Sequence, residues 1–186
     1  MPFNSASFLL LFACTFLVFS CIRAAWRWVV LLAASVVFYS ALQAPHLLVA
    51  LALVTAISYY CGLWMRRAES EARRRLVFRC AVAANVLVLV AVRYVPFLTT
   101  SLNSLLGYLG LGWSVPVSEA MVSVGVSFYV FQAISYLIDV YLEVDEPEPH
   151  LGCFSLYLSF FPKLLQGPIE RAGDLLPQLR RPLETT

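Results

Sequence analysis

The chain has 186 residues, of which 61% are hydrophobic and 13% are charged, and its mean hydropathy is +0.80. Soluble domains are about half apolar and about a quarter charged, so this composition excludes an ordinary soluble protein and indicates an all-α integral membrane protein. The formal net charge of +2 is too small to indicate a nucleic-acid partner.

About five apolar segments are suited to crossing a bilayer, because a spanning helix needs about 20 mostly apolar residues for about 30 Å of hydrocarbon. We expect a single membrane domain over residues 1–186, with the lipid bilayer as its surroundings and spans at 7–21, 28–42, 46–65, 76–97 and 120–142. The first two segments are short, which allows tilt or shallow seating. We interpret the first as a retained span, because its only nearby arginines follow the apolar run instead of preceding it.

The arginines predict the orientation of these spans. Arg23 and Arg27 lie between the first and second spans, and six more lie between the third and fourth, namely Arg66, Arg67, Arg73, Arg74, Arg75 and Arg79. Two spans separate the two loops, so both face one side, which the positive-inside rule makes cytoplasmic. We therefore expect the N-terminus and a loop from Thr99 to Ser118 to be outside. In that loop, SLNSLLGYLGLGW is expected to form a short interfacial helix.

The fifth span carries a polar stripe. Gln132, Ser135, Tyr136 and Asp139 fall at helical spacing and share one face. Such groups are costly in a membrane helix unless the face meets protein or water. Two interpretations stay open: the stripe lines a cavity or packing interface, or Asp139 lies near the cytoplasmic end and simply reaches the aqueous interface. The acidic loop EVDEPEPH that follows is expected to be cytoplasmic.

The last apolar segment, 153–167, is interrupted in a way that a plain spanning helix is not. Pro162 removes a helix donor, and Gly167-Pro168 disfavours regular helix at Gly167. A full crossing would put Arg171 outside, whereas a segment that enters and returns keeps it inside. We therefore expect a kinked or re-entrant segment. Its polar neighbours form either an interfacial helix end or a polar constriction for a charged substrate, namely Lys163, Gln166, Glu170 and Arg171.

No catalytic constellation or metal site is visible in the sequence. It has no nucleophile elbow and no Gly-rich phosphate loop. Its two histidines, His46 and His150, lie far apart and make no metal-ligand spacing. From these residues alone, a transporter fragment and an enzyme chamber both stay open.

Two long motifs resemble the membrane-bound O-acyltransferase (MBOAT) family, and within it the bacterial alginate O-acetyltransferase branch. The pattern G-[IV]-S-F-Y-x-F-x-[AS]-I-S-Y-x-I-D-V-Y is matched from Gly125 to Tyr141, and F-P-x-L-x-x-G-P-[IV]-x-R from Phe161 to Arg171. The opening MPFNSASFLLLF and the pieces VVFYS and RYVPF also resemble that branch, so the resemblance covers essentially the whole chain.

The resemblance implies a multi-helix enzyme of the bacterial inner membrane that moves an acyl group, typically acetyl, to a hydroxyl of an exported polysaccharide such as alginate. The implied donor is a cytoplasmic one such as acetyl-CoA, with no bound cofactor, and the implied partner is the polysaccharide or a periplasmic acetyl-transfer protein. The helices would surround a funnel. The residues expected to wall or shape it are Gln132, Tyr136, Asp139, Pro162, Gln166, Gly167, Pro168 and Arg171.

The resemblance covers only an N-terminal portion. Family members are more than twice this length, and their invariant histidine, assigned as general base, follows in a later segment. Neither His46 nor His150 matches it, so no catalytic residue is assigned here. Loss of a general base lowers proton transfer by a factor of about 10² to 10⁴, so we expect this chain alone to be inactive and to need the missing C-terminal half. The alternatives are a non-catalytic truncated membrane partner and a transport component.

Overall fold

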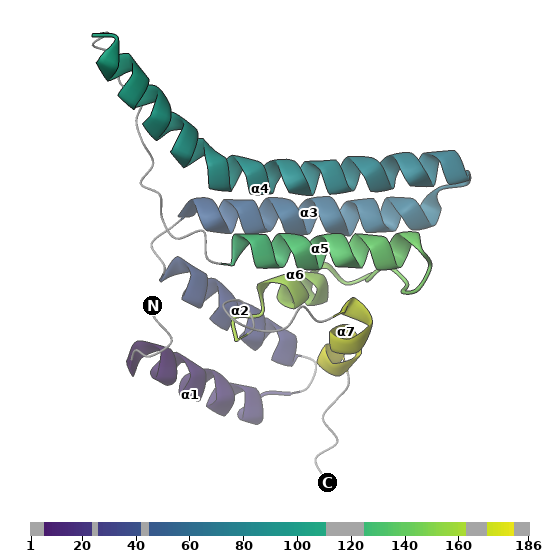
Figure 1. Cartoon of the computed structure of the whole chain (residues 1–186). Helices are drawn as coiled ribbons and strands as arrows, with labels where there is room; N and C mark the ends of the chain where they lie inside the picture. Colours follow the sequence, from purple (N-terminus) through teal and green to yellow (C-terminus); the bar gives the residue numbers. More distant parts are fainter. Residues whose placement is uncertain (1–5, 24–25, 42–44, 111–124, 163–170, 181–186) are drawn as a thin grey trace.

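The computed structural model describes residues 6–23, 26–41, 45–110, 125–162 and 171–180. These residues form helices and no strand (Figure 1), which confirms the expected all-α class for the described part of the chain. The helices are α1 (Ala6–Cys21), α2 (Arg27–Ser40), α3 (Pro45–Arg67), α4 (Glu71–Tyr108), α5 (Val126–Tyr141), α6 (Leu151–Ser159) and α7 (Ala172–Arg180).

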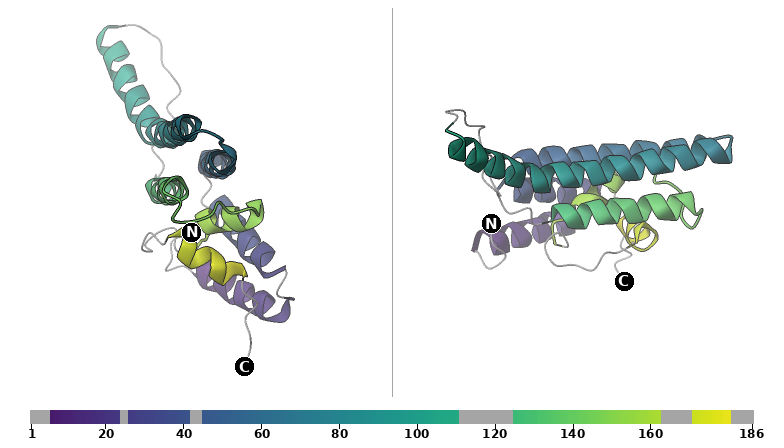
Figure 2. Two further views of the ribbon diagram at one scale, coloured as in Figure 1. Left: turned by 90° about the vertical axis from the view of Figure 1, so that its right-hand side faces the viewer. Right: turned by 45° about the horizontal axis from the view of Figure 1, so that its top comes forward.

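Helices α3, α4 and α5 lie side by side and pack against one another in all three pairs (Figures 1 and 2). The short helix α6 packs against α2, α3, α5 and α7, and α1 packs on α2. The core lies where α5 meets α3 and α6, and it is rich in fully buried aromatic rings. These rings are Tyr129, Tyr136, Phe154 and Tyr157. The polar stripe of α5 therefore faces the interior of the bundle.

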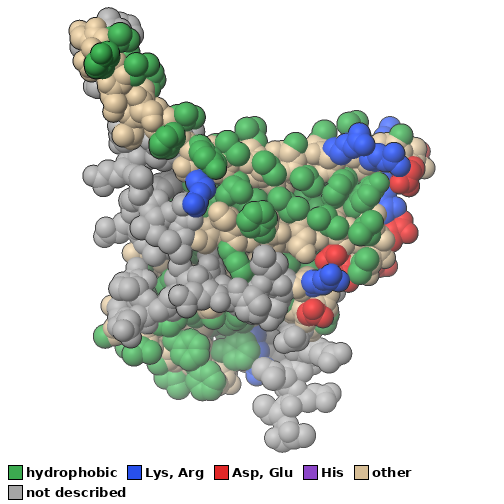
Figure 3. Space-filling model, viewed as in Figure 1, with side chains coloured by type: hydrophobic (Ala, Val, Ile, Leu, Met, Phe, Trp, Pro, Cys, Tyr) green, Lys and Arg blue, Asp and Glu red, His purple; other side chains and the backbone are tan. Residues whose placement is uncertain are grey.

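Two helical stretches, Leu47–Arg67 and Glu71–Tyr94, are long and apolar enough to cross a membrane. Helices α1, α2 and α5 are apolar but shorter, with 16, 14 and 16 residues. Each expected span overlaps a described helix, with residues 42 and 120–124 outside the described residues, and the count of about five spans stays a prediction. The outer surface of α4 is apolar, as a lipid-facing surface would be (Figure 3), with exposed Leu76, Val86, Leu87, Val90 and Tyr94.

The expected loop start at Thr99 is wrong, because α4 continues without a break to Tyr108. The first eight residues of SLNSLLGYLGLGW are helical, as expected, but they belong to α4 and do not form a separate short helix. The hydroxyl of Ser104 donates to the carbonyl of Thr100, four residues back, as a helix allows. Pro96 lies within α4 but does not end it. Instead, α4 bends toward its C-terminal end (Figure 1), the usual response of a helix to an internal proline. Residues 111–118 lie outside the described residues.

Helix α6 covers the start of the expected kinked segment at 153–167 and ends at Ser159, three residues before Pro162. Nine helical residues rise about 14 Å, less than half of a hydrocarbon core of about 30 Å. Residues 163–167 lie outside the described residues, so the choice between crossing and re-entry stays a prediction.

Gly152 allows α6 to approach α2 closely. A Cβ atom built there would lie 2.7 Å from Cη2 of Trp28 and closer still to its Cζ3. We expect Gly152→Ala to lower the free energy of unfolding by about 1–3 kcal/mol, because the Trp28 ring must move. Thermal unfolding of the purified protein would measure this change. The matched control is Gly107→Ala in α4, whose new Cβ meets nothing within 4 Å. Equal losses in both variants would contradict this packing.

Candidate functional site

Charged side chains gather at one end of the α3–α4–α5 group (Figure 3). The connection between α3 and α4 lies there, together with residues 142–150, which we call the acidic loop and which join α5 to α6. Arg66 pairs with Glu146, with 3.3 Å between Nη1 and Oε2, and Arg74 pairs with Glu143. The α3–α4 connection and the acidic loop, both expected to be cytoplasmic, therefore lie at the same end of the bundle.

Arg74 fixes the end of α5. Its side chain is only 17% exposed, and its Nη2 donates to the backbone carbonyls of Tyr141 and Val140, the latter at 3.3 Å. The last carbonyls of a helix lack partners within the helix, so a cation there satisfies them and complements the helix dipole. The guanidinium also lies over the Tyr141 ring, 5.4 Å from its centroid. The sequence marked Arg74 only as a topological charge, and this anchoring role was missed.

Two buried tyrosines hold the far end of the acidic loop. The hydroxyl of Tyr136 in α5 accepts from the backbone N–H of Glu148 at 3.2 Å. The hydroxyl of Tyr59 in α3 donates to the carbonyl of Pro149 at 2.7 Å. The two tyrosines come from different helices, so the loop is tied to both α3 and α5 and has a defined path across the end of the bundle.

His150 closes the loop as the N-cap of α6. Its Nδ1 accepts from the backbone N–H of Cys153 at 3.2 Å, and its own N–H donates to Oε1 of Glu148 at 3.0 Å. The His150 ring lies edge-on to Trp28, with 4.9 Å between the ring centroids. A ring nitrogen that accepts a capping bond is engaged in structure, which agrees with assigning no catalytic role to His150.

The hydroxyl of Tyr136 gives a direct test of this loop geometry. We expect Tyr136→Phe to destabilise the protein by about 1–3 kcal/mol, because the buried N–H of Glu148 loses its acceptor. Hydrogen exchange should then be faster at the Glu148 amide. Tyr60→Phe is the control, since Tyr60 is 50% exposed, and it should change neither quantity. An unchanged Glu148 amide in Tyr136→Phe would contradict the bond.

The polar stripe of α5 packs against α6 and the acidic loop. Gln132 is buried, and its Nε2 donates to the carbonyl of Tyr157 at 3.1 Å. Asp139 is 6% exposed, and its Oδ2 has no hydrogen-bond partner among the described residues. Its backbone carbonyl accepts from Val144 and Asp145, at 2.9 and 3.3 Å. Asp139 is thus a buried carboxylate at the foot of the loop, with the charges of Arg171 and Asp145 acting on it.

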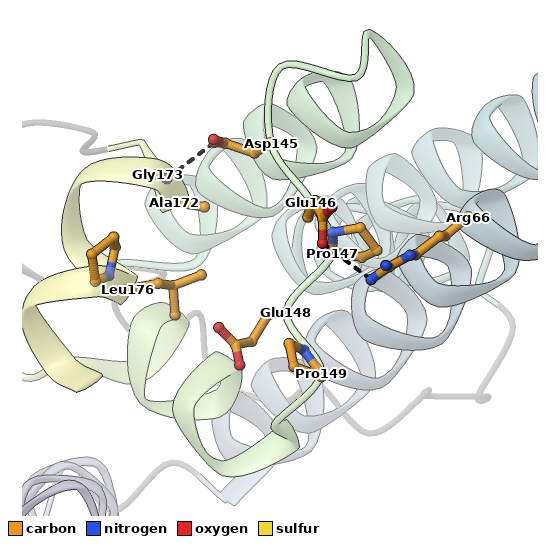
Figure 4. A pocket seen from close by; sticks show the side chains of 10 residues that line it. Arg66, Asp145, Glu146, Pro147, Glu148, Pro149, Ala172, Gly173 and Leu176 are labelled. Atoms are coloured by element: carbon orange, nitrogen blue, oxygen red, sulfur yellow. Dashed lines mark hydrogen bonds and ion pairs between the residues drawn. The ribbon is translucent and has the colours of Figure 1, made fainter. Parts of the chain in front are cut away.

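A pocket of about 500 Å³ opens beside this loop (Figure 4). One wall is the acidic loop with Arg66, and the opposite wall is α7; the lining residues are Arg66, Asp145, Glu146, Pro147, Glu148, Pro149, Ala172, Gly173, Leu176 and Pro177. Oδ2 of Asp145 accepts from the N–H of Gly173 at 3.1 Å and so ties the walls together. Because carboxylates outnumber the single arginine in this lining, its charge does not favour a phosphate ligand.

Of the other predicted site residues, Pro162 lies apart from this group, Arg171 lies close enough for its charge to act on Asp139, and three cannot be placed. Pro162 lies in an exposed turn, next to Phe161, whose N–H donates to Oγ of Ser35 at 3.3 Å. Arg171 is exposed and directly precedes α7, and its carbonyl accepts from the backbone N–H groups of Asp174 and Leu175. Gln166, Gly167 and Pro168 lie outside the described residues, as do Lys163 and Glu170. The structure thus brings together Gln132, Tyr136 and Asp139, and no group of His, Cys, Asp and Glu in the described residues is arranged to hold a metal.

Comparison with known proteins gives relatives along the whole chain. The chain is 34% identical over 189 residues to the Azotobacter vinelandii protein named "Probable alginate O-acetylase AlgI", and 35% identical over 190 residues to the Pseudomonas aeruginosa protein of that name. Each match covers 100% of this chain and 37% or 36% of the relative. A "Peptidoglycan O-acetyltransferase" of Helicobacter pylori is 26% identical over 179 residues, covering 82% of this chain and 32% of the relative. No family model and no solved structure matches.

Proposed function

Because the chain belongs to the membrane-bound O-acyltransferase family, in the alginate O-acetylase branch and as its N-terminal portion, we propose that the complete protein O-acetylates an exported polysaccharide. The chain spans about a third of the length of the curated relatives it matches, so the activity belongs to the protein of which it forms part. The observation that carries the proposal is identity above 30% with alginate O-acetylases over the entire chain.

The acceptor in this proposal is a hydroxyl of alginate or a similar polymer outside the membrane, reached directly or through a periplasmic acetyl-transfer partner. The donor is a cytoplasmic acyl thioester such as acetyl-CoA. The protein crosses the bacterial inner membrane several times, with its N-terminus outside. The pairs of Arg66 and Arg74 with the acidic loop support this orientation, as does the contact of Trp28 at the start of α2 with His150 at the end of that loop.

The role proposed for this chain is to form the cytoplasmic end of the chamber. The acidic loop is held by Arg66, Arg74, Tyr59 and Tyr136. A loop held over a polar stripe in this way provides a fixed wall for that end of the chamber. The remaining site residues are proposed to bend the chain behind that wall, namely Pro162, Gln166, Gly167, Pro168 and Arg171.

Deletion of the gene, followed by measurement of acetyl ester in the exported polysaccharide, tests the proposal. We expect the ester content to fall to background in the deletion strain. It should return when the complete reading frame is restored. Unchanged ester content in a strain that still exports polymer would overturn the proposal and favour a non-catalytic partner or a transport component.

A further inference from the structure

Arg27 presents buried, unused hydrogen-bond donors where α1 and α2 meet. Its Nε and Nη1 are buried and have no hydrogen-bond partner among the described residues. Its guanidinium lies over the Phe19 ring of α1, 5.0 Å from the ring centroid. A cation so held, with its donors unsatisfied, is costly unless an acceptor binds. The contacts therefore indicate a missing anionic group.

The start of α2 adds a second reason for an anion at this point. Arg27 is the first residue of α2, and Trp26 at the N-cap provides no side-chain hydrogen bond to the helix. The N-terminus of a helix carries partial positive charge and free N–H groups. A cation in that position is unfavourable by itself, but together with a bound anion it is favourable.

An apolar groove of about 230 Å³ is lined in part by Phe19, the ring that Arg27 contacts. Its lining comes from α1, α2 and the turn after α6, namely Phe12, Thr15, Phe16, Phe19, Leu31, Phe160, Phe161 and Pro162. The one hydroxyl in this lining, of Thr15, donates to the carbonyl of Leu11 at 2.7 Å. The groove thus offers hydrocarbon contact and no free donor. Phe12 and Phe16 are 49% and 61% exposed, so the groove opens outward from the bundle.

Two residues connect the groove to Arg27. Leu31 follows Arg27 by one turn on the same face of α2, and Phe19 is shared by the cation contact and the groove. From Phe19 to Phe12 the α1 surface extends about 10 Å along the helix. An anionic head at Arg27 therefore continues directly into an apolar channel on the outer surface of the bundle.

We propose that this is a phospholipid site, with the lipid phosphate held by Arg27 and one acyl chain lying in the groove. Charge complementarity selects the phosphate, and the dry, outward-open groove selects a chain attached to it. Free phosphate would satisfy Arg27 but would leave the groove unused. This proposal is about lipid binding and requires only that α1 and α2 lie in the membrane. It therefore does not depend on the proposed acetyl transfer.

Photolabelling in a defined bilayer tests the site. The protein with its native flanking sequence is placed in phosphatidylcholine nanodiscs that contain a trace of phosphatidylglycerol with a diazirine in one acyl chain. After irradiation, we expect label on the α1 peptide that contains Phe12 and Phe16. Arg27→Gln should lower that label about tenfold, as expected for loss of a charged hydrogen-bond donor.

Arg23→Gln is the matched control, because Arg23 is an exposed arginine in the same connection, and it should leave the label nearly unchanged. Equal labelling of the two variants would overturn the proposal. So would loss of the label in millimolar inorganic phosphate, which would identify a site for free phosphate. If Arg27→Gln does not fold, Leu31→Trp fills the groove and keeps Arg27. Full labelling of that variant would also overturn the proposal.

Discussion

Replacement of Arg74 by alanine is expected to lower the free energy of unfolding by about 2–3 kcal/mol, because a charged donor to buried backbone carbonyls is lost. The Arg74 side chain is mostly buried and reaches the last carbonyls of α5 as well as Glu143. Without it, those carbonyls lose their partner and the acidic loop loses its first anchor. Unfolding of the purified protein in detergent gives the change in free energy, and hydrogen exchange at the amides of Val144 and Asp145 gives the local loosening.

Arg75→Ala is the control for that measurement. Arg75 follows Arg74 directly, but its side chain is 53% exposed and its contact to Glu71 is 3.9 Å, one turn away on the same helix. Exposed pairs of this kind contribute about 0.3–0.5 kcal/mol. A loss in Arg75→Ala as large as that in Arg74→Ala would mean that a general charge effect, and not the contact with α5, is responsible.

Replacement of Asp139 by asparagine is expected to lower acetyl transfer by the complete protein by about tenfold or more, equivalent to about 1.4 kcal/mol at the transition state. A buried carboxylate oxygen without a partner costs stability. A contribution to stability therefore does not explain why a carboxylate is buried at position 139. We propose that the charge of Asp139 positions other groups at the cytoplasmic end of the chamber. Asparagine keeps the size of the side chain and removes the charge.

The folded state should tolerate Asp139→Asn, with unfolding unchanged or shifted to higher temperature. Ser135→Ala, a change in the same stripe at a half-buried position, should leave transfer close to the wild-type rate. Full activity in Asp139→Asn would remove Asp139 from the proposed site. A parallel loss of activity and stability would mean instead that the carboxylate has a structural role.

The features that could be predicted from the sequence are those with a local signal. The apolar runs of α3 and α4 exceed the length of a membrane crossing and were found from composition alone. The spacing of Gln132, Tyr136 and Asp139 placed them on one face, and all three are buried. Pro162 was expected to interrupt helix, and α6 ends just before it.

Other features depend on contacts between residues far apart in the chain. The bond from Tyr59 to Pro149 joins residues 90 positions apart, and the anchoring by Arg74 spans 66 or more. Neither leaves a local pattern. Helix α7 was missed although Ala172, Leu175 and Leu176 have helical spacing and are buried, because Pro177 within it argues against a helix.

Acetyl transfer measured with the donor supplied to one side of the membrane at a time tests the central proposal most directly. Inverted inner-membrane vesicles, which turn the cytoplasmic surface outward, would carry the complete protein together with its polysaccharide acceptor and receive acetyl-CoA labelled in the acetyl group. We predict protein-dependent incorporation of label as alkali-labile ester, and little incorporation when the donor is supplied to right-side-out vesicles. The same low labelling in inverted vesicles with and without the protein would contradict acetyl transfer from the cytoplasmic end of this bundle.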